Sequence, residues 1–314
     1  MRKPAQWSLK CVDAGSEYCP CYLAENGHCF VCSLLAGAES CDCRWSGSCS
    51  YLNYWFGSGA IANRSERTVI VEKQRLGSNL LKIRFALEAE WLPSYSQAGT
   101  FLFIRPAFAP SSAAVPISVV DVSGNEVCLV VKCVGPKTSL LLAADDRVVI
   151  RGPYFSGLTD TQILKTTRNE EAVLVAGGMG QSAIVMAAKA LLRGGNTIKV
   201  CLAPGSANLV YVGEKLRSYG AEVEEVASMR PFGLRVIAGW LTQLKPAVVV
   251  CAGPEVLQAA VSALAPSSRT EFVRSQNITM CCGDGLCGSC LSVHFGQERI
   301  PLCKAQYRLS KGGN

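Results

Sequence analysis

The stretch LVAGGMGQSA, residues 174–183, decides the fold of the second half of this chain. It starts as an apolar run typical of a buried strand, passes through Gly177, Gly178 and Gly180, and continues into a helix-like segment. Glycines between a strand and a helix let the backbone approach the phosphates of a dinucleotide at the N-terminus of the helix. Taken alone, the same pattern is also typical of an ordinary turn, so it needs support from the surrounding sequence.

That support comes from a regular alternation of segments. Strand-like runs (172–178, 197–203, 221–227 and 247–253) alternate with helix-like runs (180–195, 207–220, 233–244 and 254–265). Such alternation predicts a parallel sheet covered by helices on both faces. The fourth strand ends in Cys251, Gly253 and Pro254, which should lie at the carboxyl edge of the sheet beside the glycine turn, where α/β proteins bind ligands.

Residues 68–150 have a different rhythm, with short β-prone runs separated by turn residues. Several short strands with regular turn signals predict a small antiparallel barrel. Three turns here could contact a ligand, although each, taken singly, also fits an ordinary turn. They are Pro116-Ile117-Ser118, the pre-helix turn with Gly135, Lys137 and Thr138, and Arg151-Gly152-Pro153.

The cysteines gather at the two ends of the chain. Five of the 17 lie between residues 281 and 303, and Cys282, Cys287, Cys290 and Cys303 follow C-x4-C-x2-C-x12-C. This is the plant-type [2Fe–2S] spacing, whereas structural zinc more often shows two C-x2-C pairs. We predict a [2Fe–2S] cluster here, with zinc or plain buried thiols as the alternatives, and interpret Cys281 as a neighbour of the cluster.

Eight cysteines lie near the N-terminus in a dense pattern typical of metal chemistry. They could hold two [4Fe–4S] clusters, one cluster plus a structural zinc, or zinc alone, and disulfides or free thiols are the remaining alternative. The spacing differs from that of bacterial ferredoxins and does not indicate which of the cysteines would bind the same metal centre. The residues are Cys11, Cys19, Cys21, Cys29, Cys32, Cys41, Cys43 and Cys49.

Composition excludes several classes of protein. The chain has 314 residues, 49% of them apolar, and a formal net charge of +7 that thiolate-bound clusters would lower. No apolar run is long enough to span a membrane, and no basic stripe with interleaved aromatics indicates nucleic-acid binding. The start, MRKPAQWSLKC, has no apolar stretch of a secretory signal behind it. We therefore expect a cytoplasmic protein.

In this order, the motifs resemble those of the ferredoxin–NADP reductase superfamily. With the C-terminal cysteines, the chain from about residue 68 to the end resembles the electron-transfer subunit of dihydroorotate dehydrogenase. It also resembles the small subunits of NADH-dependent ferredoxin:NADP oxidoreductases and of sulfide dehydrogenases. The resemblance implies FAD on the barrel, NAD(P) on the α/β domain and a [2Fe–2S] cluster on the C-terminal extension.

The resemblance also assigns roles to residues, with departures from the family pattern. Ala114-Val115 stands where the family has an arginine before its flavin motif, so Arg105 or Arg151 would substitute for it. Lys137 stands where a glycine is common, and the dinucleotide loop lacks a later proline. The matched residues are Pro116, Ile117 and Ser118 for the flavin ring; Gly135 and Thr138 for its pyrophosphate, in the turn that also holds Lys137; Gly152 and Pro153 for the late barrel turn, directly after Arg151; Gly177, Gly178 and Gly180 for the dinucleotide loop; and Cys251, Gly253 and Pro254 for the second nucleotide motif.

We thus predict an α+β multidomain chain with a cysteine-rich segment (1–59), an FAD-binding β-barrel (64–158), an NAD(P)-binding α/β domain (168–266) and a [2Fe–2S] segment (270–314). The expected function is that of an oxidoreductase subunit that transfers electrons between NAD(P)H, FAD and iron–sulfur clusters. Its partner would be a catalytic subunit or a ferredoxin-like carrier in a hetero-oligomer. No acid–base constellation adds catalytic residues beyond the cofactors. The alternative is a redox-sensing or scaffold iron–sulfur protein without flavin turnover; nucleotide preference and direction of electron flow stay open.

Overall fold

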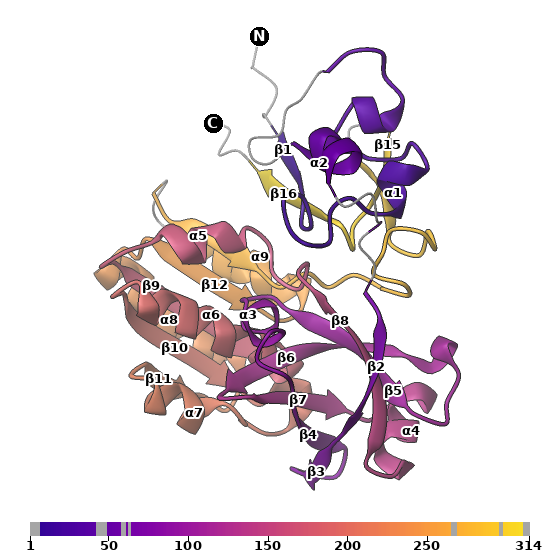
Figure 1. Ribbon diagram of the computed structural model, residues 1–314. Coiled ribbons are helices and arrows are strands. Elements are labelled where there is room, and N and C mark those ends of the chain that lie inside the picture. The colour runs from indigo at the N-terminus through magenta and orange to yellow at the C-terminus, as the bar shows by residue number, and fades with distance from the viewer. Residues whose placement is uncertain are drawn as a thin grey trace. The chain divides into compact units, whose positions relative to one another are not determined.

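The protein is described by a computed structural model (Figure 1). The structure describes residues 7–41, 49–57, 61, 64–264, 269–294 and 298–309, so Cys43 of the predicted metal ligands lies outside the described residues. The chain divides into two compact units. The larger unit is Glu66–Asn277, and the smaller unit combines Met1–Ser65 with Ile278–Asn314.

The first half of the larger unit is a seven-stranded antiparallel sheet of order β2-β8-β5-β6-β7-β4-β3. The edge strands β2 and β3 are separated in sequence only by Val71, although they lie at opposite edges, so the sheet must curl back on itself. The predicted barrel is therefore a curled half-barrel. Its strands are β2 (Glu66–Ile70), β3 (Glu72–Arg75), β4 (Leu80–Ala86), β5 (Phe101–Pro106), β6 (Val115–Ser123), β7 (Glu126–Lys132) and β8 (Arg147–Tyr154), with short helices α3 (Leu92–Tyr95), η2 (Ser111–Ala113) and α4 (Pro136–Ala143).

The second half is a parallel sheet of order β11-β10-β9-β12-β13. This confirms the predicted alternation and adds β13, which lies within the range 270–314 that we had assigned to the cluster segment. The strands are β9 (Glu171–Gly177), β10 (Thr197–Ala203), β11 (Glu222–Glu225), β12 (Val248–Ala252) and β13 (Glu271–Arg274). The helical segments are α5 (Thr161–Thr166), η3 (Gly178–Gly180), α6 (Gln181–Arg193), η4 (Gly205–Ala207), α7 (Gly213–Ser218), η5 (Met229–Gly233), α8 (Leu234–Leu244) and α9 (Glu255–Leu264).

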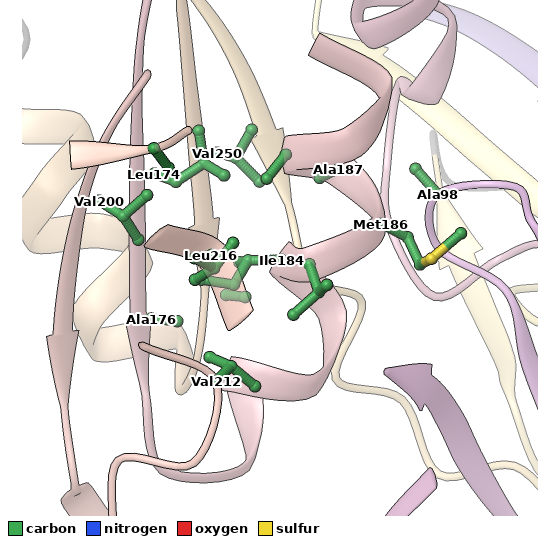
Figure 2. Close-up of a cluster of buried hydrophobic side chains, with 14 of the residues drawn as sticks. Ala98, Leu174, Ala176, Ile184, Met186, Ala187, Val200, Val212, Leu216 and Val250 are labelled. Atoms are coloured by element: carbon green, nitrogen blue, oxygen red, sulfur yellow. The ribbon is translucent and has the colours of Figure 1, made fainter. Parts of the chain in front are cut away.

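The strands of the parallel sheet are apolar on both faces because helices cover both. Figure 2 shows Leu174 and Val250 on one face, beside Ile184 and Ala187 of α6. The neighbouring residue Val173 belongs to a separate core that α8 and α9 complete. Burial on both faces explains why these strands appear in the sequence as continuous apolar runs without alternation.

The expected helix at 207–220 is wrong in its first half, because only α7 is helical there. The buried amide of Gln181 explains the difference. Its Nε2 donates to the Leu209 carbonyl at 2.9 Å, and its Oε1 accepts from the Tyr211 N–H at 3.0 Å. These bonds hold residues 209–211 outside a helix and leave α7 to begin after them.

Asp121 of β6 connects the curled sheet to the parallel-sheet half of the same unit. Its carboxylate accepts hydrogen bonds from Lys189 of α6 and from the Tyr219 hydroxyl, both at 2.7 Å, and pairs with Lys215 at 3.0 Å. Burial alone would raise the pKa of Asp121, but these donors lower it below its ordinary value. The carboxylate is thus held ionised between the two halves.

The smaller unit joins the two ends of the chain. Strand β1 (Trp7–Cys11) pairs antiparallel with β16 (Ala305–Leu309), and Cys11 lies opposite Ala305 (Figure 1). Its other elements are α1 (Tyr22–Glu25), η1 (Leu34–Ala36), α2 (Ser50–Phe56) and the hairpin β14 (Leu291–His294) with β15 (Glu298–Pro301). Nowhere in the described ranges is a helix long and apolar enough to cross a membrane.

Candidate functional site

Two of the predicted barrel turns meet on three neighbouring strands, β6, β5 and β8. The central strand, β5, pairs with the Pro116-Ile117-Ser118 motif on one side and with the segment Arg151–Tyr154 on the other. The facing positions are Phe101 with Ser118 and Tyr154, and Phe103 with Pro116 and Arg151. Motifs about 35 residues apart in the sequence thus form one surface.

Three aromatic rings pack together beneath this surface, and each of them is at most 3% exposed. Phe101 and Phe103 point away from the half-barrel core that holds Leu102, because neighbouring strand residues face opposite sides. The Tyr154 ring centroid lies 5.3 Å from each phenylalanine ring. The Arg151 guanidinium lies 4.9 Å above the Phe103 ring and donates to the Tyr154 hydroxyl. The sequence analysis missed these aromatics, although the alternating phenylalanines of TFLFI were the signal for them.

Gly152 is required where β8 crosses β5. A Cβ atom at this position would lie 3.0 Å from the Leu102 Cβ and 3.3 Å from its Cα. A larger residue would fit only if Leu102 shifted slightly. The R-G-P motif therefore brings the aromatic surface together and does not merely turn the chain.

The turn before α4 uses its side chains internally. The Thr138 hydroxyl accepts from the Gly135 N–H at 3.1 Å and from the Val134 N–H at 3.2 Å. The Lys137 ammonium donates to the Ser112 carbonyl. A phosphate would therefore meet the backbone N–H groups of the first helical turn, which have no partners within a helix.

Of the two arginines that could replace the family arginine, only Arg151 lies on the aromatic surface. Arg105 donates to the Glu66 carboxylate and to the Ala109 carbonyl, both at 2.6 Å. These contacts hold the Arg105 guanidinium against β2 and the segment after β5. Arg151 is thus the better placed of the two.

The glycine turn lies against the end of β12. Gly178 has a φ of 58°, in the left-handed region, and a Cβ at Gly180 would lie only 2.2 Å from the Ala252 carbonyl oxygen. A Cβ at Gly253 would lie 3.8 Å from the Gly177 carbonyl oxygen. Both nucleotide motifs therefore meet at the carboxyl edge between β9 and β12, where the strand order reverses.

The second motif is held by residues that the sequence analysis did not single out. The Gly253 N–H donates to the Ser275 hydroxyl at 3.1 Å, and its carbonyl accepts from Gln258 at 2.8 Å and from Asn277 at 2.7 Å. The Cys251 side chain is fully buried in the core with α9, and this burial raises its pKa to about 12. Cys251 can therefore meet a nucleotide only through its backbone.

The predicted C-terminal ligands come together. The Cys303 thiol is hydrogen-bonded to the sulfur atoms of Cys282 and Cys290. The Cys287 thiol is hydrogen-bonded to the Cys282 sulfur. The bond from Cys303 lowers the pKa of Cys282 to about 4 and that of Cys290 to about 6. Two backbone N–H groups also point at sulfur, Asp284 at Cys282 (3.3 Å) and Cys303 at Cys290 (3.4 Å).

The N-terminal cysteines separate into groups. Four of them line a common cavity, whereas Cys32 is buried beside Ala24 and Leu35 in a small apolar core. Cys41 and Cys49 are exposed. Among the described residues at either end of the chain, no three or more His, Cys, Asp or Glu side chains are grouped so that they could hold a metal ion. The four that share the cavity are Cys11, Cys19, Cys21 and Cys29.

The sequence is similar to those of known electron-transfer subunits. No family model matches the chain. The electron transfer subunit of dihydroorotate dehydrogenase B (NAD(+)) from Clostridium perfringens is 28% identical over 182 residues, 56% of this chain and 71% of that protein. The probable electron transfer subunit from Pyrococcus abyssi is 31% identical over 234 residues, 71% of this chain and 83% of that protein.

The fold itself has solved counterparts. The structure of the NADH-dependent reduced ferredoxin-NADP oxidoreductase, reported for flavin-based electron bifurcation, matches with a TM-score of 0.58 at 23% identity. The match covers 78% of this chain and 87% of that one, and shows a common ferredoxin reductase-like fold. With the sequence relatives, it establishes that the chain belongs to the family of dihydroorotate dehydrogenase B electron-transfer subunits, within the ferredoxin–NADP reductase superfamily.

Proposed function

We propose that the chain is an NAD(P)H-dependent flavoprotein subunit that transfers electrons, through FAD and a [2Fe–2S] cluster, to or from a partner oxidoreductase subunit or a ferredoxin-like carrier. The observation that carries the proposal is the meeting of the P-I-S and R-G-P motifs on one aromatic surface, in the same unit as the glycine turn. The names of the relatives support an electron-transfer role in a complex with a catalytic subunit.

The surface on β6, β5 and β8 suits a flat, polar-edged ring such as that of FAD. Ser118 contributes a hydroxyl at its edge, and Arg151 contributes a cation already oriented by Tyr154. Gly152 allows β8 to lie close against β5, since a Cβ there would press against Leu102. Gly135 leads into α4, whose first turn would take the pyrophosphate through the backbone N–H groups of Lys137 and Thr138.

The glycine turn suits a dinucleotide. Gly180 allows the loop to lie directly on Ala252, and Gly178 adopts a left-handed backbone that other residues rarely adopt. Helix α6 then begins at the turn, so its N-terminal dipole would favour an anionic phosphate. Gln258, Ser275 and Asn277 hold the facing Gly253 turn in place through hydrogen bonds, so the backbone at this edge of the sheet is well fixed.

The C-terminal cysteines suit a [2Fe–2S] cluster in their donor chemistry. All four offer sulfur, the mutual hydrogen bonds show that the sulfurs face one another, and the spacing is of the plant type. The N–H groups of Asp284 and Cys303 would stabilise negative charge on the ligands. Gly283, Gly285 and Gly288 have left-handed φ values that let the loop wrap around the site.

When bound, FAD would supply the exchange between a hydride, which carries an electron pair, and the single electrons that a [2Fe–2S] cluster takes or gives. The chain's own residues hold and orient them: Arg151 and Ser118 at the ring, Gly177–Gly180 at the nucleotide, and four thiolates at the cluster. No proton donor is needed from the chain for this exchange, which agrees with the lack of an acid–base constellation in the sequence.

The test is anaerobic purification of the full chain, with flavin, iron and sulfide measured against protein. We expect one flavin per chain and a flavin absorbance band that NADH or NADPH bleaches. Cys282→Ser should abolish the [2Fe–2S] EPR signal and leave this bleaching intact. Material with iron and sulfide but no flavin, or with flavin that neither nucleotide reduces, would refute the proposal and favour the redox-sensing alternative.

A further inference from the structure

A cavity at the far end of α6 from the glycine turn has no part in the proposed function. Its volume is about 420 Å³, which is within the range of small-molecule sites. Segment 93–98 of the half-barrel, α5 with the residues that follow it, and the end of α6 form its wall (Figure 1). Helix α6 has 13 residues, so its two ends lie about 20 Å apart. The cavity is therefore separate from the nucleotide edge.

The charge around this cavity is positive. Among the described residues that line it, three are cations, Lys165, Arg168 and Arg193, and none is an aspartate or a glutamate. None of the three forms an ion pair with a carboxylate in the part of the chain that the structure describes. Lys165 donates to the Gln97 amide oxygen at 3.3 Å, and Arg168 donates to the Thr167 carbonyl at 2.8 Å. Both of these acceptors are neutral, so they do not compensate the positive charge.

A larger cavity of the same unit, of about 910 Å³, shows a different treatment of cations. Three of the four cations that line it have a carboxylate partner within 3.0 Å. Unpaired cations are thus not a general feature of the cavities of this unit. The three pairs are Arg84 with Glu72, Lys215 with Asp121, and Arg217 with Glu225.

A buried asparagine brings two of the cations together. Asn196 is 4% exposed, and its amide donates to the Thr167 carbonyl at 3.0 Å and to the Leu191 carbonyl at 2.7 Å. These bonds fix the segment that carries Arg168 against the end of α6, which carries Arg193. The backbone therefore holds two like charges at neighbouring positions, although like charges repel one another.

The helix ends compensate only part of this charge. Lys165 and Arg193 lie in the last turns of α5 and α6, where a cation offsets the partial negative charge of the helix. That partial charge is about half an elementary charge for each helix, so the two helices offset about one of the three positive charges. The Leu191 carbonyl near the end of α6 also accepts from the Gly194 N–H at 2.9 Å. About two positive charges are therefore not compensated by the helices.

The rest of the lining indicates the kind of anion that would fit. Ala98 and Leu164 are buried apolar residues of the wall, and Ala190 is partly buried beside them. Ser96 and Thr161 add hydroxyl groups. Arginine binds phosphate through paired, charge-assisted hydrogen bonds. A fitting ligand combines two or more negative charges with a small, partly apolar body, which is the chemistry of an organic phosphate.

We propose that this cavity binds an organic phosphate with two or more negative charges, at a site separate from those for FAD and the dinucleotide. Lys165, Arg168 and Arg193 would bind its charged groups. The ligand would contact the half-barrel through segment 93–98 and the parallel-sheet half through α5 and α6. Because the ligand needs both walls, its binding should stabilise the larger unit as a whole.

The test is a calorimetric titration of the full chain with GTP, in the presence of excess NAD(+) to occupy the dinucleotide edge. We expect one GTP per chain and an affinity that falls as salt is added. At a concentration of about 100 times its Kd, GTP should raise the Tm of the larger unit by about 5–10 °C. Arg168→Gln and Arg193→Gln should each weaken binding about tenfold, as expected for the loss of a hydrogen bond to a charged group.

The matched control is Arg235→Gln, which removes an exposed cation of α8 outside the cavity lining and should bind GTP like the wild type. Inorganic tripolyphosphate tests the charge alone and should bind more weakly than GTP, because it has no apolar body.

Several results would overturn the proposal. They are no GTP binding, GTP binding that NAD(+) abolishes, full affinity in the double variant Arg168→Gln/Arg193→Gln, and an equal loss in Arg235→Gln. Tripolyphosphate binding as tight as that of GTP would overturn the assignment to an organic ligand. Circular-dichroism melts without ligand show whether each variant has folded. The proposed flavin function can fail independently, since the titration measures no flavin reduction.

Discussion

Replacing Gly180 with alanine tests whether the contact between the glycine turn and β12 limits this site to glycine. Gly180 has φ −59° and ψ −22°, and Gly177 has φ −129° and ψ 141°, so both have backbone angles that alanine adopts without strain. Only the space around them differs. The two substitutions therefore form a matched pair within one turn.

The expected magnitudes follow from the distances. The new Cβ at residue 180 would lie 2.2 Å from the Ala252 carbonyl oxygen, against 3.8 Å from a flexible Leu257 methyl for residue 177. Overpacking costs about 1–3 kcal/mol, and the upper end applies here because the opposing atoms are backbone. At about 2–4 °C per kcal/mol for a unit of this size, Gly180→Ala should lower the Tm of the larger unit by about 6–12 °C. Without the clash, the smaller entropy of the unfolded alanine chain would stabilise by about 0.4–1 kcal/mol, so even the sign is informative.

Circular-dichroism melts and anaerobic stopped-flow bleaching of the flavin by NADH and NADPH would measure both effects. A displacement of about 1 Å can lower a reaction rate about 100-fold, and we expect a loss of this order for Gly180→Ala. Gly177→Ala has no such clash and should stabilise the larger unit by about 0.4–1 kcal/mol. Equal melting temperatures and equal bleaching rates for the two variants would show that the contact with Ala252 does not constrain the turn.

Three further outcomes are expected. Cys282→Ser should abolish the C-terminal [2Fe–2S] EPR signal, whereas Cys281→Ser, at an exposed position, should not; loss in both would mean that the ligand assignment is wrong. Asp121→Asn should destabilise the larger unit by about 3 kcal/mol. Because the pKa of Asp121 is lower in the folded protein, this difference in stability should be present above the unfolded pKa of about 3.9 and vanish as the pH falls through the folded pKa. A difference that stays unchanged at low pH in denaturant titrations would contradict this. Arg151→Met should increase loss of flavin on gel filtration more than Arg105→Met, and the reverse order would place the flavin cation at residue 105.

Local patterns made much of the fold predictable. The glycine turn at 177–180 and the apolar run 248–252 each carry their own signal, because a strand buried on both faces must be continuously apolar. The C-x4-C-x2-C loop is equally local, so the prediction of a cluster there needed only the spacing of its cysteines. What these signals share is that all the information lies within about ten residues.

Long-range contacts could not be predicted in the same way. Phe101 and Tyr154 come together because β5 pairs with β8, and a register cannot be derived from one strand alone. The Gln181 amide overrides the helical tendency of residues 207–212 through hydrogen bonds to a segment some 30 residues away. The pairing of β1 with β16 joins segments near the two ends of the chain, and neither strand has a sequence pattern that predicts which strand it pairs with.

The smaller unit depends on its cysteines in a way that the larger unit does not. The larger unit contains three extensive apolar cores, whereas the apolar core described for the smaller unit comprises only Ala24, Cys32 and Leu35 with a few partly buried neighbours. Its other buried side chains include the Asp13–Arg64–Lys304 charges, and a buried ion network adds little net stability by itself. Metal binding that occurs only in the folded state adds its free energy to folding. The C-terminal [2Fe–2S] cluster that we propose would therefore both conduct electrons and stabilise the segment in which the two chain ends meet.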